Sequence, residues 1–506
     1  MEITDLTPAE RRVWQAFPLG EGVDFRESPE VRESPEDDPG TGGSWGPERT
    51  VRAEVLRALL LNGPTEDGEI AGMKLTGARI TGCLDLMYGT VEQPVRLRSC
   101  HFEEAPNLYG AQVRTLALSD SVLPGLKAGT LRVELALRIT CCRIAGPVRL
   151  AGAQITGAFF ANGAELGTPH DPGAPDAPDP EAAVEAVLQL NHAVIGADVW
   201  APGLVAHGQV RMNGATVGGQ VNLDGAEVGG GPGEIALDVE TLSVGTDLRA
   251  KRLRARGTVN MSGARIPRHV NLAYARLSHP GGTALRASSC VVGELWLREA
   301  APIQGTVNLR RSQLDLLYVS PEVWPDQVKL DGLGYRRLAP DLPAEQRLPL
   351  LEREATGYLP QGYEQLAAAY RTVGDEAAAR TVQLAKLRRH RRTLPAYARI
   401  WGHLQDVTVG YGFRPMRAAG WLLVLLLTGA VAFALHHPRP LKSDEAPHFN
   451  PVFYTLDLLL PIIGFGQESA FAPDGGYQWL SYLLIATGWV LVTTVAAGIT
   501  RSLSRQ

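Results

Sequence analysis

The residues that could do chemistry lie near the C-terminus, in the segment NPVFYTLDLLLPIIGFGQES at positions 450–469. Glycines such as Gly464 and Gly466 can expose consecutive backbone carbonyls, which replace the water around an ion. Asp457 is the one ionisable side chain in an otherwise apolar stretch, where a carboxylate is costly unless it faces water or a partner. The segment therefore predicts either an ion-coordinating re-entrant loop or an interfacial helix with a hydrated Asp457.

Two uncharged stretches flank this segment, at 418–435 and 479–499. Each has close to the roughly 20 residues that a bilayer-crossing helix needs. Basic residues precede the first stretch and Arg501 and Arg505 follow the second, whereas acidic residues outnumber basic ones between them. The positive-inside rule then predicts a two-span protein of the cell membrane with both termini in the cytoplasm.

The order of span, short helix, Gly-x-Gly and span resembles the two-span pore domain of potassium-channel-like proteins. Ile463, Gly464, Phe465 and Gly466 stand where that family has Val-Gly-Tyr-Gly. The resemblance implies a homotetramer around an axis that passes a monovalent cation. This chain has Pro461 and Ile462 where the family has threonines, and Gln467 where it has an acid. The letters TVGYG at 408–412 spell the potassium filter before the first span, on the predicted cytoplasmic side, which indicates a turn there.

A basic run precedes the first uncharged stretch. Its members are Lys386, Arg388, Arg389, Arg391 and Arg392. A basic segment next to a membrane span favours cytoplasmic orientation and contact with anionic lipid. The balance of 49 Lys+Arg against 54 Asp+Glu, a net charge of -5, argues against a surface built for nucleic acid.

Catalytic, metal and cofactor motifs are absent from the sequence. The five cysteines include no CxxC, and there is no dinucleotide fingerprint, P-loop, GxSxG or HExxH. His436 and His437 are adjacent and cannot share one helix face, so interfacial polarity explains them better than metal binding. We therefore expect no catalytic residues, no metal site and no cofactor.

A repeat occupies the region from about Met73 to Leu314. In VRMNGATVGGQVNLDGAEVGG, small or apolar residues stand in pairs two apart, and the pattern recurs every 11 residues. The same frame predicts the following inward pairs: Leu137/Ile139, Cys142/Ile144, Val148/Leu150, Ala153/Ile155, Phe159/Ala161, Ala164/Leu166, Val210/Met212, Ala215/Val217, Val221/Leu223, Ala226/Val228, Leu237/Val239, Leu248/Ala250, Val259/Met261, Ala264/Ile266, Val270/Leu272 and Ala275/Leu277.

Two inward residues followed by a glycine-rich corner are what a narrow β-solenoid requires. The repeat resembles the pentapeptide-repeat family, with Ala215/Val217 and Ala226/Val228 fitting its unit, although the spacing alternates between five and six. We expect a four-sided coil of about 22 residues, with a two-sided coil as the alternative. Cys100, Cys142 and Cys290 take the small inward position, which predicts inert packing.

Four regions follow from these patterns, and the fold class is mainly β. Residues 1–63 are expected to hold N-terminal helices, the first capped by Thr7, Pro8 and Glu10, and an acidic flexible loop at 26–48. Residues 64–340 form the solenoid. Residues 341–415 form a helical hairpin, which resembles one tetratricopeptide unit at Tyr370, Gly374 and Ala379, and a basic linker. Residues 416–506 form a two-span α-helical domain with a re-entrant loop at 450–470.

Three functional hypotheses remain open. The first is a non-enzymatic pore-type protein whose cytosolic solenoid senses an unidentified ligand or protein. The second is a non-conducting, membrane-anchored scaffold for protein partners. The overall layout also resembles high-GC bacterial proteins labelled membrane-associated oxidoreductases, which makes an enzyme the third hypothesis, without motif support.

Overall fold

A computed structural model describes residues 5–27, 35–169, 185–229, 235–396, 399, 415–442, 447–460 and 464–503. The side chains of residues 415, 416, 418 and 494–503 are outside the description. The chain divides into two compact units, Met1–Val373 and Gly374–Gln506.

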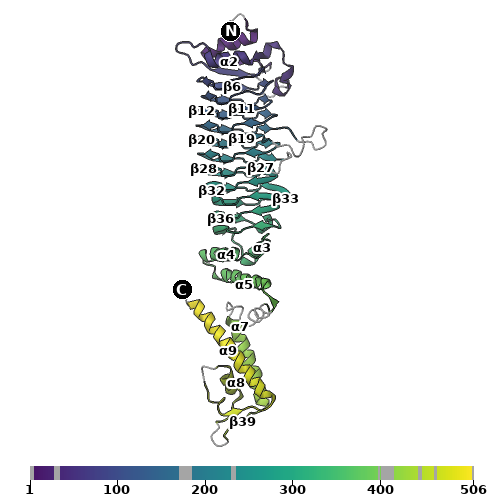
Figure 1. The fold of residues 1–506 in the computed structure, drawn as a ribbon, viewed down its shortest axis with the longest axis vertical. Coiled ribbons are helices and arrows are strands. Elements are labelled where there is room, and N and C mark those ends of the chain that lie inside the picture. Colours follow the sequence, from purple (N-terminus) through teal and green to yellow (C-terminus); the bar gives the residue numbers. More distant parts are fainter. Residues whose placement is uncertain are drawn as a thin grey trace. The chain divides into compact units, whose positions relative to one another are not determined.

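The first unit is a parallel β-solenoid of about 11 turns. In Figure 1, short strands stack turn upon turn along this unit. A typical turn contributes two short strands to each of two sheets, for example β12 and β13 to the first and β14 and β15 to the second. Leu137 pairs with Phe159 and Val148 with Leu188, the same positions one turn later. The prediction of a four-sided coil of about 22 residues is confirmed.

The first sheet contains the following strands: β1 (Gly22–Asp24), β3 (Met73–Thr76), β5 (Thr90–Val91), β6 (Val95–Arg98), β8 (Gln112–Val113), β9 (Leu116–Ala117), β12 (Arg132–Val133), β13 (Leu137–Arg138), β16 (Gln154–Ile155), β17 (Phe159–Phe160), β20 (Val194–Ile195), β21 (Val199–Trp200), β24 (Thr216–Val217), β25 (Val221–Asn222), β28 (Ser243–Val244), β29 (Leu248–Arg249), β32 (Arg265–Asn271), β34 (Val291–Leu297), β36 (Gln313–Val319) and β38 (Gly334–Ala339).

The second sheet contains the following strands: β2 (Thr50–Arg52), β4 (Arg79–Thr81), β7 (His101–Phe102), β10 (Val122–Leu123), β11 (Leu126–Lys127), β14 (Arg143–Ile144), β15 (Val148–Arg149), β18 (Glu165–Leu166), β19 (Leu188–Gln189), β22 (Val205–Ala206), β23 (Val210–Arg211), β26 (Glu227–Gly229), β27 (Ile235–Asp238), β30 (Arg254–Arg256), β31 (Thr258–Asn260), β33 (Arg276–Arg286), β35 (Gln304–Asn308) and β37 (Val328–Lys329).

The core of the solenoid is the column of inward side chains. Every residue of the inward pairs predicted from the repeat is at most 4% exposed. Each turn thus buries its apolar side chains against the turns before and after it, at about 25 cal/mol per Å² removed from water. The sequence frame located this core residue by residue.

The corners of the coil need a left-handed backbone, but not always a glycine. Thr130 and Gly152 occupy the same corner of successive turns, with φ of 53° and 67°. Cys141 and Gly163 do the same at another corner, with φ of 53° and 63°. The corners therefore have the left-handed backbone conformation that glycine adopts most easily. At several corners, however, a larger residue adopts it and is held in place by neighbouring turns.

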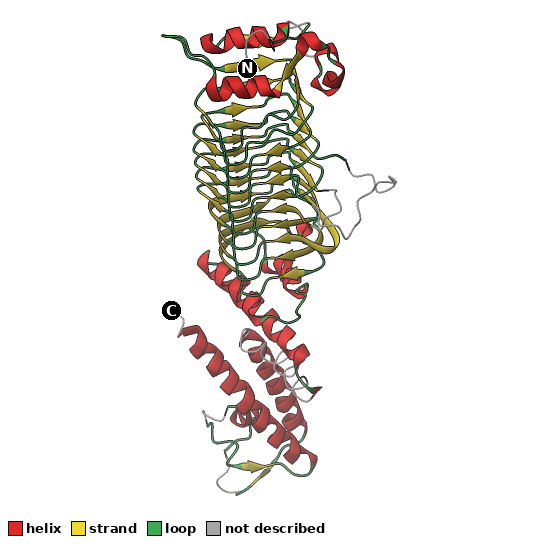
Figure 2. Cartoon of the chain, turned by 45° about the horizontal axis from the view of Figure 1, so that its top comes forward, coloured by secondary structure: helices red, strands yellow, loops and turns green. Residues whose placement is uncertain are grey.

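The N-terminal end of the solenoid is covered by helices α1 (Pro8–Leu19) and α2 (Ala53–Asn62), as Figure 2 shows. The predicted capping box is confirmed, because the Glu10 amide donates to the Thr7 hydroxyl at 3.2 Å and the Thr7 amide donates to the Glu10 carboxylate at 2.9 Å. The same carboxylate accepts from the Arg52 guanidinium at 2.7 and 2.8 Å. Glu10 therefore joins the start of α1 to the start of α2.

The acidic segment expected to be flexible is ordered over the residues that are described. It forms the 3₁₀ helices η2 (Pro35–Asp37), η3 (Pro39–Ser44) and η4 (Pro47–Arg49), while residues 28–34 lie outside the description. Arg49, 3% exposed, pairs with Asp37 at 2.9 Å, lies 3.9 Å from the Trp45 ring centre and donates to the Gly77 carbonyl at 3.1 Å. The amino-acid composition did not predict this buried guanidinium, whose contacts join the segment to the solenoid.

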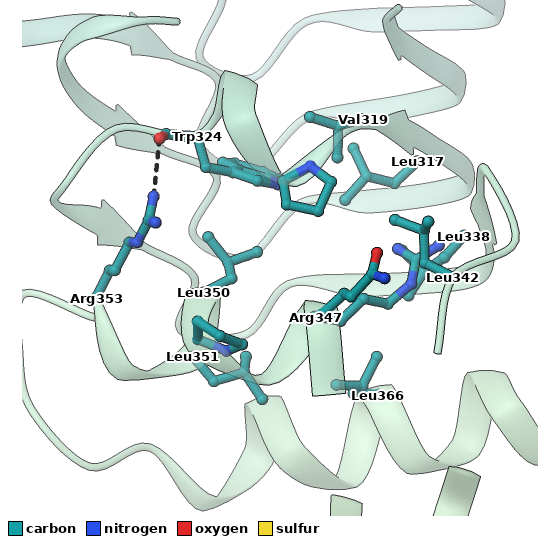
Figure 3. Close-up of a pocket in the computed structure, with 13 residues that line it drawn as sticks. Leu317, Val319, Trp324, Leu338, Leu342, Arg347, Leu350, Leu351, Arg353 and Leu366 are labelled. Atoms are coloured by element: carbon teal, nitrogen blue, oxygen red, sulfur yellow. Dashed lines mark hydrogen bonds between the residues drawn. The ribbon is translucent and has the colours of Figure 1, made fainter. Parts of the chain in front are cut away.

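The other end of the solenoid is covered by α3 (Ala344–Glu352) and α4 (Pro360–Thr372), after the 3₁₀ turn η5 (Pro321–Val323). Leucines of both helices surround a small cavity of about 50 Å³ together with Trp324 (Figure 3). Arg353 donates to the Trp324 carbonyl at 2.9 Å, which fixes the turn after α3. The cavity is too small for an organic ligand and is a packing gap between the solenoid and helices α3 and α4.

The second unit is helical. It contains α5 (Glu376–Thr393), α7 (Pro415–Leu435), α8 (Pro451–Leu459), α9 (Gly476–Leu503) and an antiparallel pair of strands, β39 (Arg439–Pro440) and β40 (Phe471–Ala472). Its main core contains Phe433, Tyr454, Leu458, Leu459, Phe471 and Leu484. Within the described residues, no helix combines the length and the apolar character needed to cross a membrane.

The predicted hairpin of the tetratricopeptide type falls across the boundary of the two units. Gly374, with φ of 82°, separates α4 from α5, and Asp375 caps α5 by accepting from the Ala378 amide at 2.9 Å. In the first unit, the Tyr370 hydroxyl donates to the Leu342 carbonyl at 2.7 Å. Ala379 lies in α5, where it is buried.

Candidate functional site

The candidate site is built on α8, the short helix between α7 and α9. The Asn450 side chain caps α8 by accepting from the amides of Val452 at 3.0 Å and Phe453 at 3.3 Å. Pro451 occupies the first turn, where a missing N–H costs nothing. These residues fix the start of a nine-residue helix that presents Asp457 near its end.

Asp457 organises the loop that follows α8. Its carboxylate accepts from the backbone amides of Gln467 at 2.7 Å and Glu468 at 3.1 Å, and also from the amide of Phe465. The residue is 5% exposed. Three amide donors compensate the loss of water around the buried charge. The requirement that Asp457 have water or a partner is therefore met by backbone amides.

Gln467 closes the loop onto the start of α8. Its side chain donates to the His448 carbonyl at 3.2 Å and accepts from the Asn450 amide at 3.2 Å. Gly466 has φ of 80°, a left-handed conformation that lets the chain turn back toward Asp457. Gln467 departs from the potassium-channel pattern, and its structural role could not be predicted from that departure.

The other predicted loop residues have different positions. Gly464, Phe465 and Gly466 are exposed, and the Phe465 ring lies 5.2 Å from the ring of Phe453. Ile463 falls within 461–463, outside the described residues. The structure thus brings Asp457 to Phe465 through a hydrogen bond and leaves the glycines at the surface of the unit.

Two glycines allow α8 to approach its neighbours closely. A Cβ at Gly429 of α7 would lie 2.4 Å from Cγ2 of Thr455, and a Cβ at Gly488 of α9 would lie 2.4 Å from the Leu459 carbonyl oxygen. Thr455 and Leu459 are buried in these contacts. Sequence reasoning missed both glycines, although each stands as an isolated Gly within a Leu-rich helix, which is a usable signal for close packing.

The two histidines at the end of α7 contact aromatic rings. His436 stacks on Tyr477 with ring centres 4.5 Å apart, and its Nδ1 lies 2.9 Å from the Tyr477 hydroxyl. The ring of His437 lies 5.1 Å from that of Phe449. Among the described residues, no three His, Cys, Asp or Glu side chains form a group that could hold a metal ion.

The outer faces of α7 and α9 carry exposed apolar side chains. On α7, Leu423, Leu427 and Val431 follow one another at helical spacing and are 56–60% exposed. On α9, Trp479 and Leu483 are 76% and 56% exposed. Contiguous exposed apolar side chains of this kind are uncommon on monomeric soluble proteins.

The predicted basic residues lie together on α5. They are Lys386, Arg388, Arg389, Arg391 and Arg392. Arg391 and Arg392 occupy the last turn, where positive charge interacts favourably with the helix dipole.

The buried cysteines have the inert role predicted for them. Cys100, Cys142 and Cys290 are at most 1% exposed. Burial raises the pKa of Cys100 and of Cys142 to about 12 and that of Cys290 to about 11. The thiolate that nucleophilic or redox chemistry requires is therefore strongly disfavoured at neutral pH.

No family model, no curated protein sequence and no solved structure matches the chain.

Proposed function

We propose that the chain is a membrane protein of pore type, in which a cytosolic β-solenoid that binds a ligand or protein is joined to a two-span helical domain. The observation that carries this proposal is the loop after α8, which is folded back onto the helix by the Asp457 carboxylate. A nine-residue helix extends about 14 Å and cannot cross a hydrocarbon core of about 30 Å. A short helix followed by a fixed, glycine-containing loop is suited to lining part of a pore.

The membrane assignment is supported by the sequence and by the exposed stripes. Residues 418–435 and 479–499 contain no charged side chain. Outward Leu423 and Leu427 on α7, and Leu483 on α9, would face lipid rather than water. The charges outside the two stretches favour cytoplasmic termini, and the basic residues of α5 would contact anionic lipid.

The pore itself would require several copies of the chain. Four copies around an axis would bring four loops together, so that the carbonyls of residues 463–466 could replace the water around a monovalent cation. In this arrangement Asp457 is a positioning residue, because its carboxylate oxygens already accept three amides. Ion coordination would then fall to the backbone.

The test is ion flux through liposomes that contain the purified protein, with wild type compared against Gly464→Ala/Gly466→Ala. The double substitution should abolish flux, because Gly466 has φ of 80° and an alanine there is strained. Gly475→Ala is the matched control, since Gly475 also has a left-handed φ, of 56°, and open space around its Cβ position. Absence of wild-type flux under several salts and potentials would contradict the pore.

A non-conducting membrane scaffold is the second candidate. It is favoured by one observation: the Asp457 carboxylate is engaged by three backbone amides of the loop. On this hypothesis the exposed faces of the solenoid bind proteins, and the helical unit only anchors them. Cross-linking in intact cells would recover the same cytosolic protein with wild type and with Gly464→Ala/Gly466→Ala, and neither would show flux.

A further inference from the structure

The solenoid is irregular at one place on its first sheet. Strands β32 and β34 pair in register at Ile266 and again at His269, but Pro267 and Arg268 stand opposite the single residue Gly293. This is a β-bulge, a feature enriched beside functional sites. A Cβ at Gly293 would lie 2.4 Å from the carbonyl oxygens of both Pro267 and Arg268, so the bulge requires a glycine opposite it.

A polar groove lies at the bulge. It has a volume of about 530 Å³, within the range of ligand sites, and extends across β32, β34, β36 and β38. The charged and titratable residues that line it are Arg268, His269, Glu294, Asp315, Arg336 and Arg337. Thr372, at the end of α4 in the same unit, also borders the groove.

Two carboxylates beside His269 are already engaged, that of Asp247 and that of Glu294, and of these Glu294 lines the groove. Asp247 contacts the His269 Nδ1 at 2.9 Å and the Arg268 guanidinium at 3.8 Å. Glu294 accepts from the Trp296 indole at 2.7 Å and lies 3.5 Å from the His269 Nε2. These contacts engage the Asp247 and Glu294 carboxylates within the protein.

The arginines of the groove are less occupied. Asp315 lies 3.4 Å from Arg336, in a pair that is largely exposed to water and therefore weak. Arg337 is exposed, and its guanidinium makes no ion pair or hydrogen bond with the described residues. Its guanidinium, with those of Arg268 and Arg336, offers planar donors that match the oxygens of phosphate and carboxylate groups.

From this geometry we propose that the bulge groove binds a small polyanion that carries phosphate or carboxylate groups. Arg337 supplies the open cation, Arg268 and Arg336 stand beside it, and Gly293 lets the backbone form the hollow. The proposal concerns equilibrium binding to the solenoid and does not depend on ion conduction by the helical unit.

The test is calorimetric titration of the full-length protein in detergent with inorganic pyrophosphate and, separately, with citrate, at near-physiological salt. Salt at this level screens general attraction between the ligand and the protein surface. Arg337→Gln should weaken binding at least tenfold. Arg265→Gln is the matched control, because Arg265 is an exposed arginine of the same sheet, at the start of β32, and does not line the groove.

A third variant gives a change of opposite sign. Glu294→Gln keeps an oxygen that can accept from the Trp296 indole but removes a negative charge from the groove, so anion binding should tighten by about threefold. A loss of folding would not produce tighter binding. Two outcomes overturn the proposal: neither anion binds the wild-type protein, or Arg337→Gln and Arg265→Gln weaken binding equally. Binding of one anion but not the other identifies phosphate or carboxylate as the recognised group.

Discussion

The solenoid and the helical unit bury their apolar residues in opposite ways. In the solenoid, inward side chains such as Phe159 and Leu223 are at most 2% exposed, and both ends are covered by helices. In the helical unit, a small core around Tyr454 coexists with leucines more than half exposed on α7. The solenoid thus buries its apolar side chains within its own turns, whereas the helical unit leaves part of its apolar surface exposed.

The largest effect is expected from a substitution in the buried core of the solenoid. Phe159→Ala should reduce the free energy of unfolding of the solenoid by about 4 kcal/mol, because the ring is fully buried between turns and its loss leaves a cavity. Val194→Ala, on the next turn but 50% exposed, should change it by less than about 0.5 kcal/mol. Chemical denaturation followed by circular dichroism measures both. Equal losses of unfolding free energy in the two variants would mean that the inward side chains do not stabilise the solenoid more than the exposed ones.

The second effect concerns the N-terminal cap and its dependence on pH. Burial by itself would raise the pKa of Glu10, but hydrogen bonds from Arg52 and from the Thr7 amide outweigh it and lower the pKa from 4.5 to about 2. A lowered pKa in the folded state stabilises the protein above the unfolded value, and this stability is lost as the pH falls from about 4.5 to about 2.

Glu10→Gln should therefore cost about 2 kcal/mol at pH 7, a value reduced by the water around the 41% exposed Arg52 side chain. The variant should also flatten the fall in stability between pH 4.5 and pH 2, which denaturation at a series of pH values measures. Glu21→Gln, at an exposed carboxyl just after α1, is the control and should leave the slope unchanged. An identical slope in wild type and Glu10→Gln would contradict the assignment.

The third effect concerns the loop of the helical unit. Asp457→Asn removes the charge and directs an amide NH₂ toward backbone donors, so it should cost about 1.5 kcal/mol locally. Hydrogen exchange at residues 464–468 should accelerate, while exchange in the solenoid stays the same. Asp474→Asn is the control, because that carboxyl is 67% exposed and pairs with Arg439 at 3.2 Å. Unchanged exchange in Asp457→Asn would show that the loop is held by other contacts.

The solenoid could be predicted from the sequence because the same pattern of apolar residues recurs every 11 residues. Each turn has the same pattern, so the inward positions, including those of the buried cysteines, could be derived from spacing alone, whereas the choice between a four-sided and a two-sided coil stayed open. The frame did not predict the bulge at Pro267 and Arg268, because it arises where the following turn is one residue shorter, and one missing residue is indistinguishable from noise in a single repeat. The prediction that the acidic segment is flexible rested on its content of Pro, Gly and acidic residues. It took no account of the single buried Arg49, which pairs with Asp37.

The site in the helical unit was predictable only in part. Asp457 was identified from its position as an isolated acid, yet its partners are backbone amides, which every sequence contains and no pattern reveals. The close packing of Gly429 against Thr455 depends on helix placement and was also missed. The contacts between residues far apart in the sequence are therefore the part of the site that could not be predicted.

The smallest expected effect on folding tests the outward stripe. Leu423→Ser/Leu427→Ser should change the unfolding free energy of the detergent-solubilised protein by less than about 0.5 kcal/mol, because both side chains are more than half exposed. Phe433→Ser, in the core beside Tyr454, should destabilise it strongly. If lipid covers the stripe, the double variant should also insert poorly into liposomes, as flotation would show. A large loss of stability in detergent would instead mean that the stripe is buried against another copy of the chain.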